Sequence, residues 1–253
     1  MIDTHCHLYT KEFDEDINLV IERALKEGIT KFYLPAIDAD CTERMFQLEN
    51  KFPANCFAMA GLHPCSVKQN FEEELLEVEN LLEKRKFSGI GETGLDFYWD
   101  KTFIREQYLA LEKQIELALQ YDLPLILHTR NATQETIDVV KKFEGKGLKG
   151  IFHCFGGNLK QAEQVISLNF FLGIGGVVTY KNAGLAEVLK HVNLKHVVLE
   201  TDAPYLSPVP MRGKRNESAY LKYIVEKIAL VKNISIDDVK DITTQNAEKI
   251  FGV

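Results

Sequence analysis

The 253-residue sequence has no uninterrupted apolar run near the roughly 20 residues that a membrane-spanning helix needs. Its N-terminus, MIDTHCHLYT, also lacks the basic segment and the apolar core of a secretory signal. Both absences argue against a membrane protein and against secretion. They predict a cytoplasmic protein with no membrane partner.

Cysteine is scarce and shows no pairing pattern. The five cysteines are odd in number and have no C-x-x-C spacing: Cys6, Cys41, Cys56, Cys65 and Cys154. This argues against a disulfide framework and fits a reducing compartment. We expect Cys6 and Cys154 to be small buried hydrophobic residues, turned by strand alternation away from the neighbouring histidines.

Positive charge is in deficit, with 30 Lys and Arg against 37 Asp and Glu and a net charge of −7. Proteins that bind nucleic acid non-specifically over a wide area usually have an electropositive surface. The composition therefore argues against that class. It does not exclude a phosphodiester substrate, because bound divalent cations would supply positive potential locally.

The sequence does contain a regular alternation of short apolar runs and amphipathic stretches. We predict strands near residues 2–7, 31–37, 56–62, 87–92, 123–128, 148–153, 170–175 and 196–201. Helices are predicted near 14–28, 42–52, 71–85, 102–121, 133–144, 158–168, 183–192 and 217–232, with a further helical pair at 235–241 and 243–251. Strict alternation at this length favours one domain, residues 1–253, folded as a closed parallel (β/α)8 TIM barrel. An open doubly wound sheet is the alternative.

Six potential metal ligands occur at or just after the ends of predicted strands: His5, His7, Glu92, His128, His153 and Asp202. Parallel strands bring their C-terminal ends to one rim, and the strand period of two turns His5 and His7 to the same face. Asp3 shares their parity and would orient a ligand imidazole or make a structural hydrogen bond. Converging nitrogen and oxygen ligands bind divalent metal, so the spacing predicts a metal-dependent hydrolase.

The metal prediction depends on all six potential ligands together, because a single histidine at a strand end is usually structural. Four of the seven histidines occur at predicted strand ends, where barrel active sites lie. A buried carboxylate such as Glu92 also needs a positive partner, which a metal would provide.

Other groups near the predicted barrel mouth bear on the substrate. The predicted substrate contacts are one imidazole and three cations: His63, Arg130, Arg212 and Lys214. His63 would alternatively cap the turn before Pro64, and the basic loop after the eighth strand is either a phosphate clamp or simply solvated. Three aromatic residues would stack on a terminal base or pack the rim loops: Tyr98, Trp99 and Tyr205.

A set of motifs in this chain resembles the TatD deoxyribonuclease family, in the family's order and over nearly the whole length. The motifs are Asp3-Thr4-His5-Cys6-His7, Gly61-Leu62-His63-Pro64, Ile90-Gly91-Glu92-Thr93-Gly94-Leu95-Asp96-Phe97-Tyr98, His128-x-Arg130, His153-Cys154-Phe155-x-Gly157, Glu200-Thr201-Asp202-Ala203-Pro204-Tyr205, Arg212-Gly213-Lys214-x-Asn216-Glu217 and Asn246-Ala247. One departure is Ser218, where the family usually has proline. We expect it to affect loop stiffness and to leave the metal site untouched.

The resemblance implies a (β/α)8 barrel of the metallo-dependent hydrolase superfamily that hydrolyses DNA ends, often from 3′ to 5′. It implies that the six ligands hold two divalent cations bridged by Glu92, with Mg or Mn as activating ions. The mixed nitrogen and oxygen ligands also suit Zn, Fe, Co or Ni. Asp202 is the candidate general base, since a metal-bound carboxylate still accepts a proton from an activated water.

Three functions compete at this point. The first is a deoxyribonuclease acting on single-stranded or 3′ DNA ends. The second is a metal-dependent ester or amide hydrolase, for example of a small amide or of an aminoacyl ester on transfer RNA, because the same activated water attacks phosphorus or carbonyl carbon. The third is a non-catalytic metal-binding scaffold. The basic rim favours phosphodiesters.

Overall fold

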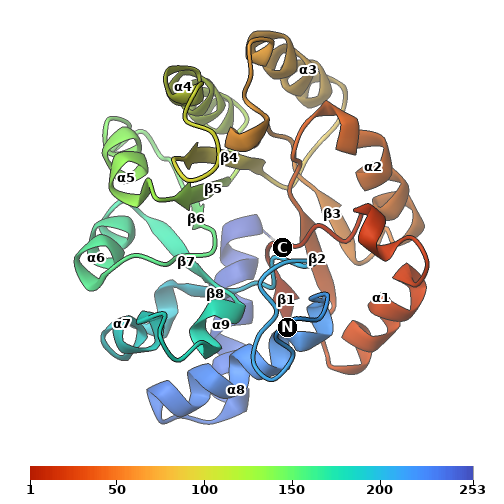
Figure 1. The fold of residues 1–253 in the computed structure, drawn as a ribbon, viewed down its shortest axis with the longest axis vertical. Helices are drawn as coiled ribbons and strands as arrows, with labels where there is room; N and C mark the ends of the chain where they lie inside the picture. Colours follow the sequence, from red (N-terminus) through yellow and green to blue (C-terminus); the bar gives the residue numbers. More distant parts are fainter. Residues whose placement is uncertain (253) are drawn as a thin grey trace.

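The computed structural model describes residues 1–252, and these residues form the predicted barrel, with parallel strands in a central ring and helices around them (Figure 1). The strands are β1 Ile2–Asp3, β2 Lys31–Leu34, β3 Cys56–Ala58, β4 Ile90–Asp96, β5 Leu125–Arg130, β6 Gly150–Phe152, β7 Phe170–Ile174 and β8 Val197–Leu199. The α-helices are α1 Ile17–Lys26, α2 Thr42–Lys51, α3 Phe71–Lys84, α4 Ile104–Gln120, α5 Thr133–Lys141, α6 Leu159–Ser167, α7 Leu185–His191, α8 Leu221–Lys232 and α9 Ile236–Phe251. Residue 253 lies outside the described residues, so a single domain of residues 1–253 stays a prediction.

The ring is closed by backbone contacts between two hydrogen-bonded groups of strands, β1 to β3 and β4 to β8. A parallel bridge between Ala60 and Ile90 joins the end of β3 to β4. On the other side, the Thr4 amide donates to the Leu199 carbonyl at 3.0 Å and joins β1 to β8. The prediction of a closed barrel is confirmed, and the open sheet is wrong.

Of the strands next to predicted metal ligands, two end furthest from their predicted C-terminal bounds. β1 ends at Asp3, because beyond it the chain bonds alternately to both neighbours, with the Cys6 amide donating to the Tyr33 carbonyl at 3.1 Å. β4 instead continues to Asp96, which pairs with Arg130 of β5. The His5-x-His7 segment is therefore held between β2 and β8, and Glu92 lies inside its strand.

The predicted pair of C-terminal helices is wrong, because α9 runs unbroken from Ile236 to Phe251. A capping box at Ser235 begins the helix and Gly252, in the left-handed region with φ 70°, ends it. Between them the chain has no glycine or proline. Thr243 satisfies its own hydroxyl by bonding back to the carbonyl four residues earlier, so it does not interrupt the helix.

Helix α9 covers the end of the barrel where the strands begin. Its Ala247 and Ile250 belong to a buried cluster with residues near the starts of β1, β2, β5, β6, β7 and β8: Ile2, Tyr33, Ile126, Ile151, Phe171 and Val198. The Phe251 ring stacks on Tyr33 with centroids 3.6 Å apart. This end is therefore closed, and the opposite end, where the strands finish, remains for a site.

Gly94 in β4 lies where the structure has no room for a side chain. Its φ is +136°, and a Cβ there would collide with the carbonyl oxygen of His128 in β5. We expect Gly94→Ala to lower the free energy of unfolding by about 3 kcal/mol or more, because backbone strain adds to lost strand pairing. Gly28→Ala is the matched control, since Gly28 also has a positive φ, +81°, but open space around it. It should cost only about 1–2 kcal/mol. Equal losses in chemical denaturation would contradict the steric explanation.

Within residues 1–252, no helix combines the length and the apolar composition needed to cross a membrane. All five cysteines lie within this range and are free thiols. The absence of a disulfide framework agrees with the cysteine pattern.

Candidate metal centre

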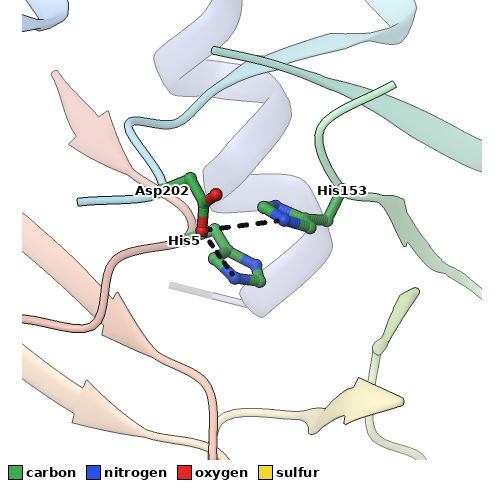
Figure 2. A group of neighbouring side chains, drawn as sticks. All are labelled: His5, His153 and Asp202. Atoms are coloured by element: carbon green, nitrogen blue, oxygen red, sulfur yellow. Dashed lines mark ion pairs between the residues drawn. The ribbon is translucent and has the colours of Figure 1, made fainter. Parts of the chain in front are cut away.

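The six predicted ligands meet at the open end of the barrel. His5 and His7 follow β1, Glu92 lies in β4, and the rest lie in or after β5, β6 and β8: His128, His153 and Asp202. Figure 2 shows three of them, with Asp202 Oδ1 3.8 Å from Nε2 of both His5 and His153. His153 Nε2 also lies 3.7 Å from Glu92 Oε1. The geometry is that of one converging cluster, as the spacing predicts.

Glu92 lies at the centre of the cluster, and its two carboxylate oxygens face different imidazoles. Oε2 is 3.1 Å from His5 Nε2 and 3.4 Å from His7 Nε2. Oε1 is 2.8 Å from His128 Nδ1 and 3.7 Å from His153 Nε2. A carboxylate in this position has one oxygen available to each of two cation sites, which is the bridging role that the resemblance implies.

The donor set fits divalent metal. Nε2 of His5 lies 3.2 Å from Nε2 of His7, and burial together with the neighbouring His153 holds the pKa of His5 well below its ordinary value. The ring is therefore neutral at neutral pH, and its Nδ1 is buried without a hydrogen-bond partner in the described chain. Against the effect of burial, the carboxylates of Glu200, Glu92 and Asp202 raise the pKa of His153 to about 10, so a bound cation would have to displace the proton of that ring. Once deprotonated, imidazoles together with ionised carboxylates are ligands for Zn, Mn, Fe, Co or Ni.

The two carboxylates of the cluster differ in exposure and in proton affinity. Burial alone would raise the pKa of Glu92, but the imidazoles of His63, His5 and His153 outweigh it and hold that pKa well below its ordinary value. Burial raises the pKa of Asp202 to about 6, against the opposing effect of His153. The Asp202 side chain is also 14% exposed, against 3% for Glu92. Asp202 is therefore the carboxylate suited to exchange a proton near neutral pH.

A second carboxylate of β4, Asp96, orients His128. Asp96 Oδ2 lies 2.9 Å from His128 Nε2, while Asp96 Oδ1 accepts hydrogen bonds from the amides of Tyr98 and Trp99. Because the carboxylate accepts the Nε2 proton, the Nδ1 lone pair of His128 is left facing Glu92. Asp96 was not predicted because the predicted strand ended at residue 92. Its parity with Glu92 in a longer strand was the available signal.

Glu200 stands in a similar place beside His153 and was also not predicted. This fully buried carboxylate lies 3.1 Å from His153 Nδ1 and accepts a hydrogen bond from the Cys154 amide at 2.5 Å. Gly173 leaves room for it, since a Cβ at that position would collide with the carboxylate. The signal in the sequence was an acidic residue that directly follows the buried run of β8, two residues before Asp202.

Removing the charge of Asp96 should weaken metal binding without touching a ligand. We expect Asp96→Asn to lower the affinity for Mn²⁺ or Zn²⁺ by about 10- to 100-fold, because an amide no longer fixes the His128 tautomer. Calorimetric titration of metal-stripped protein measures this without any turnover. Asp100→Asn is the matched control, as Asp100 lies in the next loop and pairs with Lys68 at 3.0 Å. An unchanged affinity in Asp96→Asn would contradict the assigned role.

The predicted substrate contacts divide into two groups. His63 and Arg130 line a cavity of about 610 Å³ above the cluster, together with Trp99 and Tyr205. His63 also caps the following turn, since its Nδ1 accepts from the Cys65 amide at 3.0 Å while its Nε2 lies 3.4 Å from Glu92 Oε1. The two roles proposed for His63 are thus compatible.

The other two predicted contacts lie away from this cavity in the described chain. The Arg212 guanidinium stacks 4.0 Å from the Tyr180 ring centroid, and Lys214 lines a separate surface hollow beside Arg23 and Tyr220. Neither is among the residues that line the metal cavity. A role for Arg212 and Lys214 in substrate binding stays a prediction.

The expectation that Cys154 is buried and turned away from the neighbouring histidine is wrong. Cys6 is buried as expected, but Cys154 is only partly buried and its thiol lies near His153 and Glu200. Strand alternation does not apply to Cys154, because β6 ends at Phe152 and Cys154 has φ 45°.

Ser218 also reaches towards the site. Its hydroxyl donates to Asp3 Oδ2 at 2.6 Å, and Asp3 in turn accepts from the Thr201 amide and hydroxyl. The residue that departs from the family pattern thus ties the loop after β8 to the strand before His5. Asp3 serves these structural hydrogen bonds, and its side chain does not contact an imidazole through any hydrogen bond in the described chain.

The fold and cluster agree with comparisons to known proteins. The sequence model of the family described as TatD related DNase matches residues 2–252. The metal-dependent hydrolase YabD of Bacillus subtilis is 36% identical over 100% of this chain and 99% of its own length. The 3′-5′ ssDNA/RNA exonuclease TatD of Erwinia tasmaniensis is 29% identical, with 100% of both chains covered.

The crystal structure of YjjV, a TatD homologue of Escherichia coli, superposes with a TM-score of 0.94 at 29% identity and covers 100% of this chain and 98% of that one. Family match, fold and ligand cluster lead to the same assignment. The chain belongs to the TatD related DNase family and is a metal-dependent hydrolase.

Proposed function

We propose that this hydrolase cleaves phosphodiester bonds at the ends of single-stranded DNA, from 3′ to 5′, with two divalent cations at the cluster. The observation that carries the proposal is the central Glu92, whose two oxygens face separate sets of imidazoles at the floor of the cavity. The Erwinia relative named as a 3′-5′ ssDNA/RNA exonuclease supports this substrate class.

The residues of the cluster and of the cavity wall have different roles: cation binding, proton transfer and phosphate binding. His5, His7 and Asp202 would hold one cation and His128 and His153 the other, with Glu92 between them. Cations bound there would supply an activated water and polarise the scissile phosphoryl oxygen. Asp202 then accepts the proton of the attacking water, because it is the partly exposed carboxylate with a pKa raised to about 6. Arg130 and His63, on the cavity wall, are placed to bind the phosphate.

The deciding experiment combines elemental analysis with hydrolysis of end-labelled single-stranded DNA by the wild type and by His128→Ala. The wild type should carry metal and degrade the labelled strand from its 3′ end, more slowly as salt rises. His128→Ala should lose metal and activity together. Equal nuclease activity in both would show a contaminant or a wrong site.

The same assay tests the second candidate substrate class. Turnover of a small amide or of an aminoacyl ester, with no turnover of oligonucleotides, would show that the activated water attacks a carbonyl carbon and not phosphorus. A reducing, cytoplasmic location fits the free thiols and stays a prediction.

A further inference from the structure

Trp99 is the single tryptophan of the chain, and it is 67% exposed on the wall of the metal cavity. Tryptophan is a large side chain that proteins bury to a high degree on average. Trp99 therefore contributes little to the core. Its position on the cavity wall indicates that it contacts a ligand there.

The aromatic loop around Trp99 is held in place by Asp96, the carboxylate that orients His128. Asp96, which fixes His128, also accepts the backbone amides of Tyr98 and Trp99 at 2.8 and 2.9 Å. The Tyr98 and Trp99 rings meet edge to face at 4.9 Å and 84°. One carboxylate thus couples the position of the indole to that of a metal-ligand imidazole.

Arg130 completes this group. Its guanidinium lies 4.1 Å from the Tyr98 ring centroid and 5.2 Å from that of Trp99, and it follows His128 by two residues on β5. No carboxylate of the described chain pairs with it, whereas Arg215 in the loop after β8 is paired with Asp16. Arg130 is therefore a cation fixed by ring stacking, with N–H groups left for an anion.

From this geometry we infer that Trp99, Tyr98 and Arg130 form a nucleobase subsite, where the base beside the scissile phosphate stacks on Trp99 while Arg130 binds that phosphate. Flat aromatic faces beside a cation are the features with which proteins bind single-stranded nucleic acid, and stacking tolerates any base. The subsite rests on the proposed function, because it assigns the terminal nucleotide a place. It explains how an acidic protein binds a polyanion through one local contact.

The test uses two oligonucleotides that differ only in the 3′-terminal nucleotide, one with thymine and one abasic. Trp99 is the only source of tryptophan fluorescence in the sequence, so binding is measured directly by titration of the metal-loaded Asp202→Asn variant, in which turnover is expected to be slow. We expect thymine-ended DNA to quench the emission and to bind about 5- to 150-fold more tightly than the abasic strand. Equal affinities, or no quenching by either strand, would overturn the subsite.

Turnover of the same two strands by variants gives the second measurement. The preference of the wild type for the thymine end should persist in Trp99→Phe and fall close to one in Trp99→Ala. Leu230→Ala, at a 75% exposed apolar residue on α8, is the surface control and should keep the wild-type preference. A preference that persists in Trp99→Ala would overturn the subsite. Quenching by thymine-ended DNA without cleavage of either strand would instead overturn the proposed function and leave the base-binding subsite supported.

Discussion

Replacing Glu92 by glutamine should abolish hydrolysis, with turnover lowered by about 10³-fold or more and the content of bound metal reduced. Glutamine has nearly the same shape but no charge, and only one of its two terminal atoms can accept. In the structure both oxygens of Glu92 are engaged, Oε2 at 3.1 Å from His5 and Oε1 at 2.8 Å from His128. The variant therefore loses one side of the bridge and the negative charge that compensates two cations.

The measurements are metal stoichiometry by elemental analysis and turnover of labelled DNA at saturating Mn²⁺. Glu49→Gln is the matched control, because Glu49 is a half-buried glutamate that pairs with Arg85 on the outside of the barrel at 2.5 Å. It should keep both metal and activity. Two bound ions and wild-type turnover in Glu92→Gln would show that Glu92 does not bridge.

The convergence of the six predicted ligands could be anticipated from sequence because it depends on topology alone. His128 lies near the end of β5 and His153 directly follows β6, and parallel strands finish at one rim whatever their side chains are. Convergence of the ligands therefore needed only the number and direction of the strands. The exact length of a strand was not required.

Predicting the residues that orient the candidate ligands would have required exact strand lengths and the space around particular glycines. Asp96 belongs to the site only because β4 continues four residues beyond Glu92. That continuation needs Gly94, because any side chain there would collide with the backbone of β5. Glu200 depends on the space left by Gly173 in β7. Such steric complementarity joins residues that are distant in sequence, and no periodicity encodes it.

The basic loop after β8 shows that sequence alone does not predict which surface cations are free to bind a phosphate. A run of cations at a barrel rim predicts a phosphate clamp, but Arg215 is bound by Asp16 and Arg212 stacks on Tyr180. Whether a surface cation is free depends on which acids and rings the fold places beside it. Among the described residues, the unpaired guanidinium that lines the metal cavity is that of Arg130, which β5 positions two residues after His128.

Asp202→Asn should separate metal binding from chemistry. The Oδ1 atom of Asp202 lies 3.7 to 3.8 Å from Nε2 of His7, His5 and His153, so an amide oxygen there can still bind a cation. Asparagine also tolerates the left-handed backbone at this position, φ 58°, so the loop should keep its course. We expect most of the metal to remain and turnover to fall by about 10²- to 10⁴-fold, the usual loss when a general base is removed.

The pH dependence gives this prediction its sharpest form. A general base acts only when deprotonated, so wild-type turnover should fall as pH drops through the pKa of Asp202. That pKa is about 6 without cations, and bound cations would lower it, so the acid limb should lie at or below about 6. Asp202→Asn should lack this limb, because an amide does not titrate. Unchanged turnover in the variant, or a residual activity with the same acid limb, would assign proton transfer to another group. His63 would then be the first to test, since its imidazole faces the same cavity and its Nε2 lies 3.4 Å from Glu92.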